Sequence, residues 1–334
     1  MVKHEFIAKA PKVIQLPLWL LISSRPRQWL KNTALFAPLV FEGEFFNPER
    51  FWIVSFGFII FCAVTSAIYL INDVIDVQKD RAHPFKSKRP IAAGRIKPGI
   101  ALIAAFLLLV ASLFVANKIS TYFTIATAAY AILQIFYSLF LRSAILLDVM
   151  AIASGFLIRV FAGAVLIDAH VTIWFILTVA SLALFLAVGK RRSERTLLLA
   201  SGKDLGTRSI LLHYPESLLD SLTVMFATTC WFSYTMFTFV QPTPSAGPQV
   251  LVLFGDLPRT FLASKWLMAT VPFVIYGVMR YLYVIHEKKE GESPERVLLS
   301  DFPLLLTVIS WTLMVFIIIY ASQFLPLKIA RFLQ

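Results

Sequence analysis

Long apolar stretches, separated by shorter polar segments, dominate the chain. A transmembrane helix needs about 20 mainly apolar residues, and nine stretches approach that length. They are residues 28–46, 51–71, 99–117, 119–141, 145–167, 171–189, 218–240, 262–285 and 302–325. Lys31 and Pro38 interrupt the first of them. Because the runs are continuous rather than alternating, they favour helices over β-barrel strands. We therefore predict an all-α polytopic membrane bundle of about nine transmembrane helices.

The composition supports a membrane protein built as one domain. Of the 334 residues, 58% are hydrophobic and only 15% are charged, whereas soluble domains carry about 25% charged residues. No linker is long enough to divide the chain, so we expect one transmembrane domain over residues 1–334, with residues 1–27 as a cytoplasmic or interfacial segment. Cys62 and Cys230 lie in apolar runs without metal-ligand spacing, which favours two buried packing residues.

The distribution of positive charge predicts an orientation. Across the nine expected spans, 24 of the 31 Lys and Arg residues fall on the N-terminal side and six on the other. The positive-inside rule then places the N-terminus in the cytoplasm and the C-terminus outside the cell (inner or plasma) membrane. The net charge of +12 is explained by topology and anionic ligands, so no nucleic-acid partner is expected. Long connections, where sites are often built, all fall on the cytoplasmic side: residues 72–98, 190–217 and 286–301.

Acidic residues cluster directly after the second expected span, in the stretch "NDVIDVQKD". Asn72, Asp76 and Asp80 are spaced i, i+4, i+8, and Asp73 precedes Asp76 by three. On a continuing helix these like charges would repel, and carboxylates at a membrane edge are unfavourable without a partner. Hard oxygen ligands with room for water and phosphate oxygens suit Mg²⁺. We predict a magnesium site formed by these four residues, with the three aspartates as catalytic groups.

Basic residues follow at once in "RAHPFKSKRP". Arg81, Lys86, Lys88 and Arg89 offer bidentate forks and point charges to phosphate oxygens. Acids and bases on one loop suit a diphosphate, because a metal bridges the acids to phosphate and the bases neutralise the remaining charge. The alternative is a solvated loop that obeys the positive-inside rule, with its acids paired to local bases.

The whole segment resembles the first signature of the UbiA-type membrane prenyltransferase superfamily. The matching residues are Asn72-Asp73-x-x-Asp76-x-x-x-Asp80-Arg81, followed by Pro84, Lys86, Arg89-Pro90 and Gly94-Arg95. This resemblance implies a nine-helix bundle around a central cavity that opens to the cytoplasmic side and binds a diphosphate with Mg²⁺. The span count and the orientation above agree with it and do not depend on it.

The connection after the sixth expected span distinguishes branches of this superfamily. Ordinary members move a prenyl group from a prenyl diphosphate to an aromatic acceptor, and they carry a second acidic motif there. This chain instead has "GKRRSERTLLLASGKDLG", with only Glu194 and Asp204 as acids. A basic segment suits a ligand pair with more phosphoryl groups. "RPRQWLKN" (25–32), "LDVMAIASGFLIRVFAGA" (147–164) and "GKRRSE" (189–194) resemble the polyprenyl-phosphate (decaprenyl-phosphate) 5-phosphoribosyltransferases.

That branch implies transfer of 5-phosphoribosyl from phosphoribosyl pyrophosphate to a polyprenyl phosphate, with release of diphosphate. The product, phosphoribosyl polyprenol phosphate, is a precursor of lipid-linked pentose donors used as cell wall precursors. An ionised phosphate oxygen is the nucleophile, so no general base is needed. This agrees with five histidines that form no evident triad.

Further polar residues are candidate substrate ligands, each with a simpler alternative. Arg27 and Lys31 begin the first span, where cations also extend to the interface without binding a ligand. Asp148 and Arg159 share one face of the fifth span but lie about 16 Å apart along its axis, so each needs a partner elsewhere, in a site or in an interhelical salt bridge. The predicted substrate-binding residues are Arg27, Lys31, Arg81, Lys86, Arg89, Tyr137, Arg142, Asp148, Arg159, Lys190 and Arg191.

Two other functions compete with phosphoribosyl transfer. A conventional aromatic prenyltransferase would carry the second acidic motif that is missing here. A lipid-phosphate transporter would carry paired broken helices and a site near the membrane midplane, whereas the charged motifs lie at the expected cytoplasmic edge. The sequence leaves the length of the lipid and the oligomeric state open, and a homo-oligomer is compatible with it.

Overall fold

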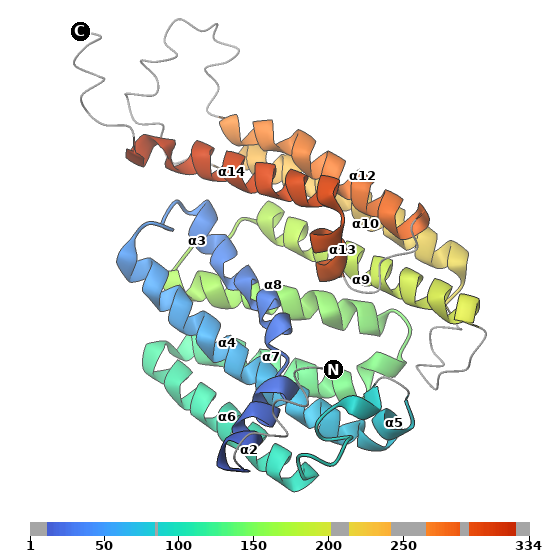
Figure 1. Cartoon of the computed structure of the whole chain (residues 1–334). Coiled ribbons are helices and arrows are strands. Elements are labelled where there is room, and N and C mark those ends of the chain that lie inside the picture. Colours follow the sequence, from blue (N-terminus) through green and yellow to red (C-terminus); the bar gives the residue numbers. More distant parts are fainter. Residues whose placement is uncertain (1–11, 84–85, 202–213, 242–264, 288–293, 325–334) are drawn as a thin grey trace, which may run out of the picture. The chain divides into compact units, whose positions relative to one another are not determined.

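The computed structural model describes residues 12–83, 86–201, 214–241, 265–287 and 294–324, most of which are helical (Figure 1). These ranges contain no β-strand, so the all-α prediction is confirmed. The described residues fall into two compact units, which are taken in turn, and the expectation of one domain stays a prediction. Some predictions concern residues outside the described ranges, namely residues 1–11 of the interfacial segment, Pro84, Asp204, residues 262–264 and residue 325.

The described residues of the first unit are 12–39, 47–83 and 86–169. Its helices are α2 (Lys12–Ser23), η1 (Pro26–Phe36), α4 (Pro48–Ile75), α5 (Val77–Ala82), η2 (Lys86–Lys88), α6 (Pro98–Ile119), α7 (Thr121–Leu139), η3 (Leu141–Ser143) and α8 (Leu147–Ile167). The helix α4 is central, because it contacts α2, α5, α6, α7, α8 and η1. At its start the Asn47 side chain accepts hydrogen bonds from the Glu49 and Arg50 amides, with Pro48 in the first turn. This cap is a favourable start for a helix.

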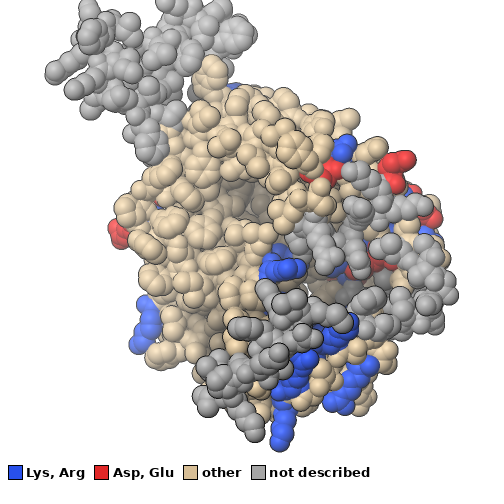
Figure 2. Space-filling view, in the orientation of Figure 1, with Lys and Arg blue, Asp and Glu red and all other residues tan. Residues whose placement is uncertain are grey.

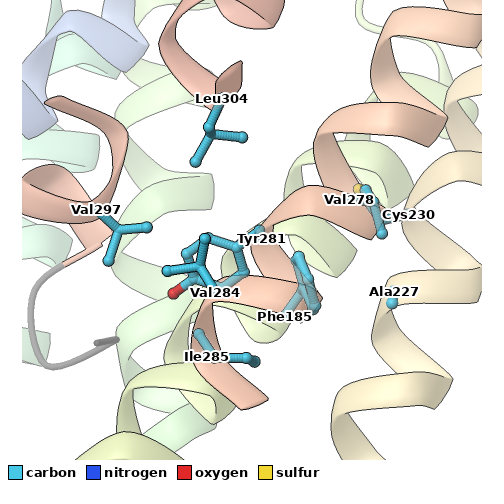
Figure 3. Close-up of a cluster of buried hydrophobic side chains, with 9 residues drawn as sticks. All are labelled: Phe185, Ala227, Cys230, Val278, Tyr281, Val284, Ile285, Val297 and Leu304. Atoms are coloured by element: carbon cyan, nitrogen blue, oxygen red, sulfur yellow. The ribbon is translucent and has the colours of Figure 1, made fainter. Parts of the chain in front are cut away.

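The described residues of the second unit are 40–46, 170–201, 214–241, 265–287 and 294–324. Its helices are α9 (Ile173–Ser201), α10 (Glu216–Val240), η5 (Trp266–Thr270), α12 (Val271–Glu287), α13 (Pro294–Ser300) and α14 (Phe302–Phe324). The boundary between the two units, after Leu39, falls within the short helix α3 (Ala37–Phe41). Figure 3 shows one of the cores of this unit, where Phe185 of α9, Cys230 of α10 and Tyr281 of α12 are buried together. Cys62 is buried too, so both cysteines are packing residues, as the sequence predicts.

Seven described helices are long and apolar enough to cross a membrane. They match seven of the nine predicted spans: Pro48–Ile75, Pro98–Ile119, Thr121–Leu139, Leu147–Ile167, Ile173–Thr196, Trp266–Glu287 and Phe302–Tyr320. Phe106 and Phe114 of α6 are exposed. Of the described surface in Figure 2, most is formed by residues other than Lys, Arg, Asp and Glu, which are drawn in tan. The predicted span 218–240 corresponds to α10, a single helix of 25 residues. It lies outside the set of seven, and its sequence is rich in Ser and Thr.

The first predicted span, residues 28–46, is not one long helix. The chain instead forms an 11-residue 3₁₀ helix, η1, and then the five-residue helix α3. Runs of 3₁₀ helix longer than three or four residues are uncommon. Pro38 cannot donate a backbone hydrogen bond, and the Asn32 side chain is buried against α4 and α8, with hydrogen bonds to Thr65 and Arg159. Tertiary contacts therefore decide the conformation here.

Gly163 permits the close approach of η1 to α8. A Cβ atom at this position would collide with the backbone carbonyl of Leu35 in η1. We expect Gly163→Ala to lower the free energy of unfolding by about 1–3 kcal/mol, because backbone atoms must shift to relieve the overlap. Thermal unfolding in detergent measures the effect. Gly99→Ala is the matched control, since a Cβ there meets nothing within 4 Å, and equal melting temperatures for the two variants would contradict the prediction.

Candidate functional site

The acidic motif lies where α4 ends and α5 begins. Asp76 interrupts the helix with φ −92° and ψ 7°, yet the hydrogen-bond pattern of a helix continues across it. The Asp76 amide donates to the Asn72 carbonyl at 2.9 Å, and the Asp80 amide donates to the Asp76 carbonyl at 2.8 Å. The predicted column of Asn72, Asp76 and Asp80 therefore persists through a local break.

Three arginines meet the three carboxylates of this motif. Asp73 is 3% exposed and pairs with Arg25. Arg89 bridges two acids, because its Nη1 atom lies 2.5 Å from Asp80 Oδ2 and 3.3 Å from Asp73 Oδ1. Since Asp73 and Asp80 are both buried, these pairs offset the desolvation of two charges.

Asp76 has its own arginine in a bidentate arrangement. Arg142 Nη1 donates to Oδ2 at 2.7 Å and Arg142 Nη2 donates to Oδ1 at 2.8 Å. Burial raises the pKa of Asp76, but the hydrogen bonds and charge of Arg142, with the charges of Lys79 and Lys86, outweigh it and hold that pKa below its ordinary value. The same hydrogen bonds raise the pKa of Arg142. The carboxylate is therefore ionised at neutral pH.

The Asp76–Arg142 pair gives stability a defined pH dependence. A carboxyl group with a lowered folded pKa contributes stability above its unfolded pKa of about 4, and loses it as the pH falls through the folded value. We expect wild type to melt above Arg142→Met at neutral pH, and the gap to shrink as the pH falls below about 4. Melting temperatures in detergent at a series of pH values test this, and a gap that stays constant on acidification would contradict it.

Four of the eleven predicted substrate-binding residues lie at or beside the acidic motif, namely Lys86, Arg89, Tyr137 and Arg142. Lys86 lies close enough to Asp76 to lower its pKa, and Tyr137 acts electrostatically on Arg142. Arg81 points elsewhere, because its side chain is exposed and donates to the Ala92 carbonyl at 3.2 Å. Arg27 is exposed in η1, Lys31 is partly buried there, and Asp148 is buried in the first turn of α8.

The basic segment predicted to be a loop is the end of a helix, because α9 continues to Ser201. Arg191 is 1% exposed and bonds Glu194 at 2.5 Å, and Lys190 lies 3.7 Å from the same carboxylate. Arg192 pairs with Asp220 at 2.5 Å. These residues belong to the second unit, and a substrate-binding role for Lys190 and Arg191 stays a prediction.

The donor atoms of the motif suit a hard divalent cation. Asp73, Asp76 and Asp80 supply carboxylate oxygens, and the buried Asn72 Oδ1 atom has no hydrogen-bond partner among the described residues. Such an oxygen-only set is typical of Mg²⁺, Ca²⁺ or Mn²⁺ sites. No cluster of three His, Cys, Asp or Glu residues preshaped for a metal occurs in the described part of the chain, since the carboxylates face arginines. The residue chemistry fits a metal, and its binding would require these arginines to turn away.

A second polar cluster, the Arg159 cluster, lies deeper in the same unit and consists of Arg159, Asn32 and Tyr130. Arg159 Nε donates to Asn32 Oδ1 at 2.8 Å, and Arg159 Nη2 donates to the Tyr130 hydroxyl at 2.6 Å. Arg159 Nη1 donates to the Gly155 carbonyl at 2.9 Å. The guanidinium also faces the Tyr130 ring, with its carbon 4.5 Å from the ring centre.

Arg25 and Tyr130 were not predicted from the sequence. Arg25 stands before Pro26 with φ 53°, a left-handed conformation that is uncommon for residues other than glycine. Its guanidinium lies 4.7 Å from the centre of the Tyr69 ring. The stretch "RPRQWLKN" was a usable signal for Arg25, whereas Tyr130 lies within an apolar span with nothing to mark it.

The apolar helices and the acidic motif define a polytopic α-helical membrane protein with carboxylates and arginines gathered at one helix end. The profile of the UbiA prenyltransferase family matches residues 33–300, and the chain belongs to this family. It is an integral membrane protein by this membership and by its seven apolar helices. The resemblance drawn from the motif is thereby confirmed.

Two relatives of this chain carry the name decaprenyl-phosphate phosphoribosyltransferase. The protein from Mycolicibacterium smegmatis is 36% identical over 291 residues, which cover 86% of this chain and 88% of that protein. The protein from Corynebacterium glutamicum is 32% identical over 309 residues, which cover 91% and 86%. The resemblance to this branch is thus confirmed as well.

Solved structures show the same fold. A UbiA homolog from Archaeoglobus fulgidus bound to DMAPP and Mg²⁺ matches with a TM-score of 0.61 at 19% identity, covering 90% of this chain and 98% of that one. At this identity the match supports the fold alone.

Proposed function

We propose that the protein transfers a 5-phosphoribosyl group from phosphoribosyl pyrophosphate to a polyprenyl phosphate, and releases diphosphate. The observation that carries the proposal is the match to the two phosphoribosyltransferases over most of both chains. The arginine-rich acidic site supports it, because both substrates are anionic. The aromatic prenyltransferase is not favoured, since the relatives' name describes phosphoribosyl transfer.

The reaction needs charge stabilisation more than proton transfer. The bond between C1 of the ribose and the diphosphate oxygen breaks, and an oxygen of the lipid phosphate bonds to C1. That oxygen is already ionised, so no group has to remove a proton from it. Burial and the charge of Lys86 lower the pKa of His83, the one histidine in the motif, so its imidazole is neutral at neutral pH. Rate acceleration then comes from positioning and electrostatics.

Asn72, Asp73, Asp76 and Asp80 would hold Mg²⁺ in this proposal. When bound, Mg²⁺ supplies positive charge that stabilises the departing diphosphate. The support is the oxygen donor set and the Asn72 oxygen without a hydrogen-bond partner among the described residues.

Arg25, Arg89 and Arg142 would bind the phosphate groups of the donor. Guanidinium groups bind phosphate with the same fork that they present to carboxylate. A diphosphate entering the site would compete with the aspartates for these arginines. Arg142 turning to phosphate would free Asp76, and Arg25 and Arg89 turning together would free Asp73 and Asp80 for the metal. Lys86 and Tyr137 lie beside this group and would add contacts.

We further propose that the acidic site faces the cytoplasm, with the N-terminus inside and the C-terminus outside. The support is the bias of Lys and Arg toward one side of the expected spans. Reporter fusions at the two termini test this orientation, and a periplasmic signal from the N-terminal fusion would contradict it.

The deciding experiment uses the full chain purified in detergent. One reaction receives Mg²⁺, labelled phosphoribosyl pyrophosphate and a polyprenyl phosphate, and a second receives Mg²⁺, a polyprenyl diphosphate and an aromatic acid. We expect the label to enter the lipid phase in the first reaction, and to stay out when the metal is chelated.

Polyprenol in place of polyprenyl phosphate is the matched control, because it lacks the nucleophilic phosphate. Label transfer to polyprenol would contradict the proposed nucleophile. A prenylated aromatic product in the second reaction, with no transfer in the first, would overturn the proposed function and favour the conventional prenyltransferase.

A further inference from the structure

Arg159 is a buried cation whose partners are all neutral. It is 5% exposed, and its hydrogen bonds go to the Asn32 amide oxygen, the Tyr130 hydroxyl and the Gly155 carbonyl. Within the described residues no carboxylate lies within ion-pair distance of it. The other deeply buried arginine of the described chain, Arg191, does have a carboxylate partner in Glu194. Asp148, on the same helix face, is about 16 Å away along the axis.

This arrangement leaves both charge and donors unsatisfied. A charge taken out of water without a counter-ion loses several kcal/mol of solvation even after relaxation, and ionisable residues within membrane helices usually mark functional sites. A guanidinium has five N–H donors, and the hydrogen bonds of Arg159 use three of them. The remaining donors match the oxygens of a phosphate group.

The seam between η1 and α4 connects this cluster to the acidic motif. Arg25 pairs with Asp73, Trp29 Nε1 donates to Ser66 Oγ at 3.1 Å, and Asn32 Nδ2 donates to Thr65 Oγ1 at 3.4 Å. Thr65 and Asn72 are seven residues apart on one face of α4. Their Cα atoms are therefore separated by about 10 Å along the helix axis. The helices α4, α7 and α8 contact one another in this unit and appear together in Figure 1.

The two sites differ in the anion they suit. The aspartates favour an anion that arrives with a metal, whereas the acid-free Arg159 cluster repels metal ions and favours an anion without one. We propose that the Arg159 cluster binds a phosphate monoester of a substrate. This inference rests on the proposed function, whose substrates carry two such groups, the C5 phosphate of the donor and the phosphate of the lipid acceptor.

Binding measurements on purified protein in detergent test the proposal without relying on turnover. The probes are ribose 5-phosphate against ribose, and polyprenyl phosphate against polyprenol, each followed by the shift in melting temperature. We expect at least one phosphorylated probe to stabilise wild type more than its phosphate-free counterpart does. Arg159→Met should weaken that binding roughly 30-fold, because a buried charge pair loses one partner. Loss of the ribose 5-phosphate shift identifies the donor phosphate, and loss of the polyprenyl phosphate shift identifies the lipid.

Arg50→Met is the matched control. Arg50 Nη1 donates to the Ile167 carbonyl at 2.6 Å, so it also links two helices through a neutral partner, and its removal should leave the probe shifts intact. Arg159→Lys keeps the positive charge but loses the paired N–H donors of the guanidinium. It replaces Arg159→Met in these experiments if Arg159→Met does not fold. It should raise KM for the same substrate that the binding data identify, with KM for the other unchanged.

Two results would overturn the inference. One is that the folded Arg159 variants respond to both phosphorylated probes as strongly as wild type does. Arg159 would then be only a structural link between η1, α7 and α8. The other is a wild type that responds to neither phosphorylated probe more than to its counterpart. If the probes bind through Arg159 but no phosphoribosyl transfer occurs, the proposed function fails while the phosphate site stands.

Discussion

Asp76→Asn is expected to lower kcat/KM for phosphoribosyl transfer by roughly 10²–10³-fold while the protein still folds. The substitution keeps the shape of the side chain but removes the negative charge that would bind the metal. It also leaves Arg142 without a charged partner. In wild type Arg142 donates hydrogen bonds of 2.7 and 2.8 Å to the two carboxylate oxygens of Asp76. Because this carboxylate is 22% exposed, the loss of the pair should lower the free energy of unfolding by only about 1 kcal/mol. Initial rates and melting temperatures measured on the same preparation separate the two effects.

The second unit offers a matched control for Asp76→Asn. Arg280 donates two hydrogen bonds to Asp301, from Nε and Nη2, both at 2.9 Å, so this pair is bidentate as well. Asp301→Asn should therefore change stability without a comparable loss of kcat/KM. Equal loss of activity in the two variants, or full activity in Asp76→Asn, would show that Asp76 serves only the fold.

The spacing of the acidic motif was sufficient to predict its position, because helix geometry is local. Asn72, Asp76 and Asp80 share one face whether or not the helix pauses at Asp76, and a carboxylate cluster at a membrane edge demands cations. What the spacing could not supply was the identity of those cations. Arg142 is 66 residues from Asp76 in sequence and Arg25 is 48 residues from Asp73, so their pairing depends on how α4 packs against η1 and on where the chain leaves α7.

The prediction of the first span failed for a related reason. Hydropathy detects the apolar residues of 28–46. It does not detect that the Asn32 side chain forms hydrogen bonds with Thr65 of α4 and Arg159 of α8. A residue that satisfies its amide across two neighbouring helices holds the chain in a 3₁₀ path, and Gly163 lets that path approach α8. The same contacts orient Arg159, which is why its neutral surroundings could not be foreseen from the fifth span alone.

Arg89→Met is expected to produce the largest combined loss, because one arginine serves two buried acids. Its Nη1 atom bonds Asp80 at 2.5 Å and lies 3.3 Å from Asp73. Asp73 would keep Arg25, but Asp80 would remain buried without a cation, which lowers the free energy of unfolding by about 3–5 kcal/mol. Activity should fall as well, since Arg89 is a proposed ligand of the donor phosphates. Denaturation in detergent and initial rates give the two values.

The double variant Arg89→Met with Asp80→Asn separates the two roles of this arginine. Neutralising Asp80 removes the unpaired charge, so part of the lost stability should return, and the two substitutions should be non-additive as expected for contacting residues. Activity should not return, because neither the phosphate ligand nor the metal ligand is restored. Arg192→Met is the control, since its partner Asp220 is 41% exposed and the pair should contribute only about 0–1 kcal/mol. Recovery of activity together with stability in the double variant would contradict a role for Arg89 in donor binding and leave it as a support of the α4–α5 corner.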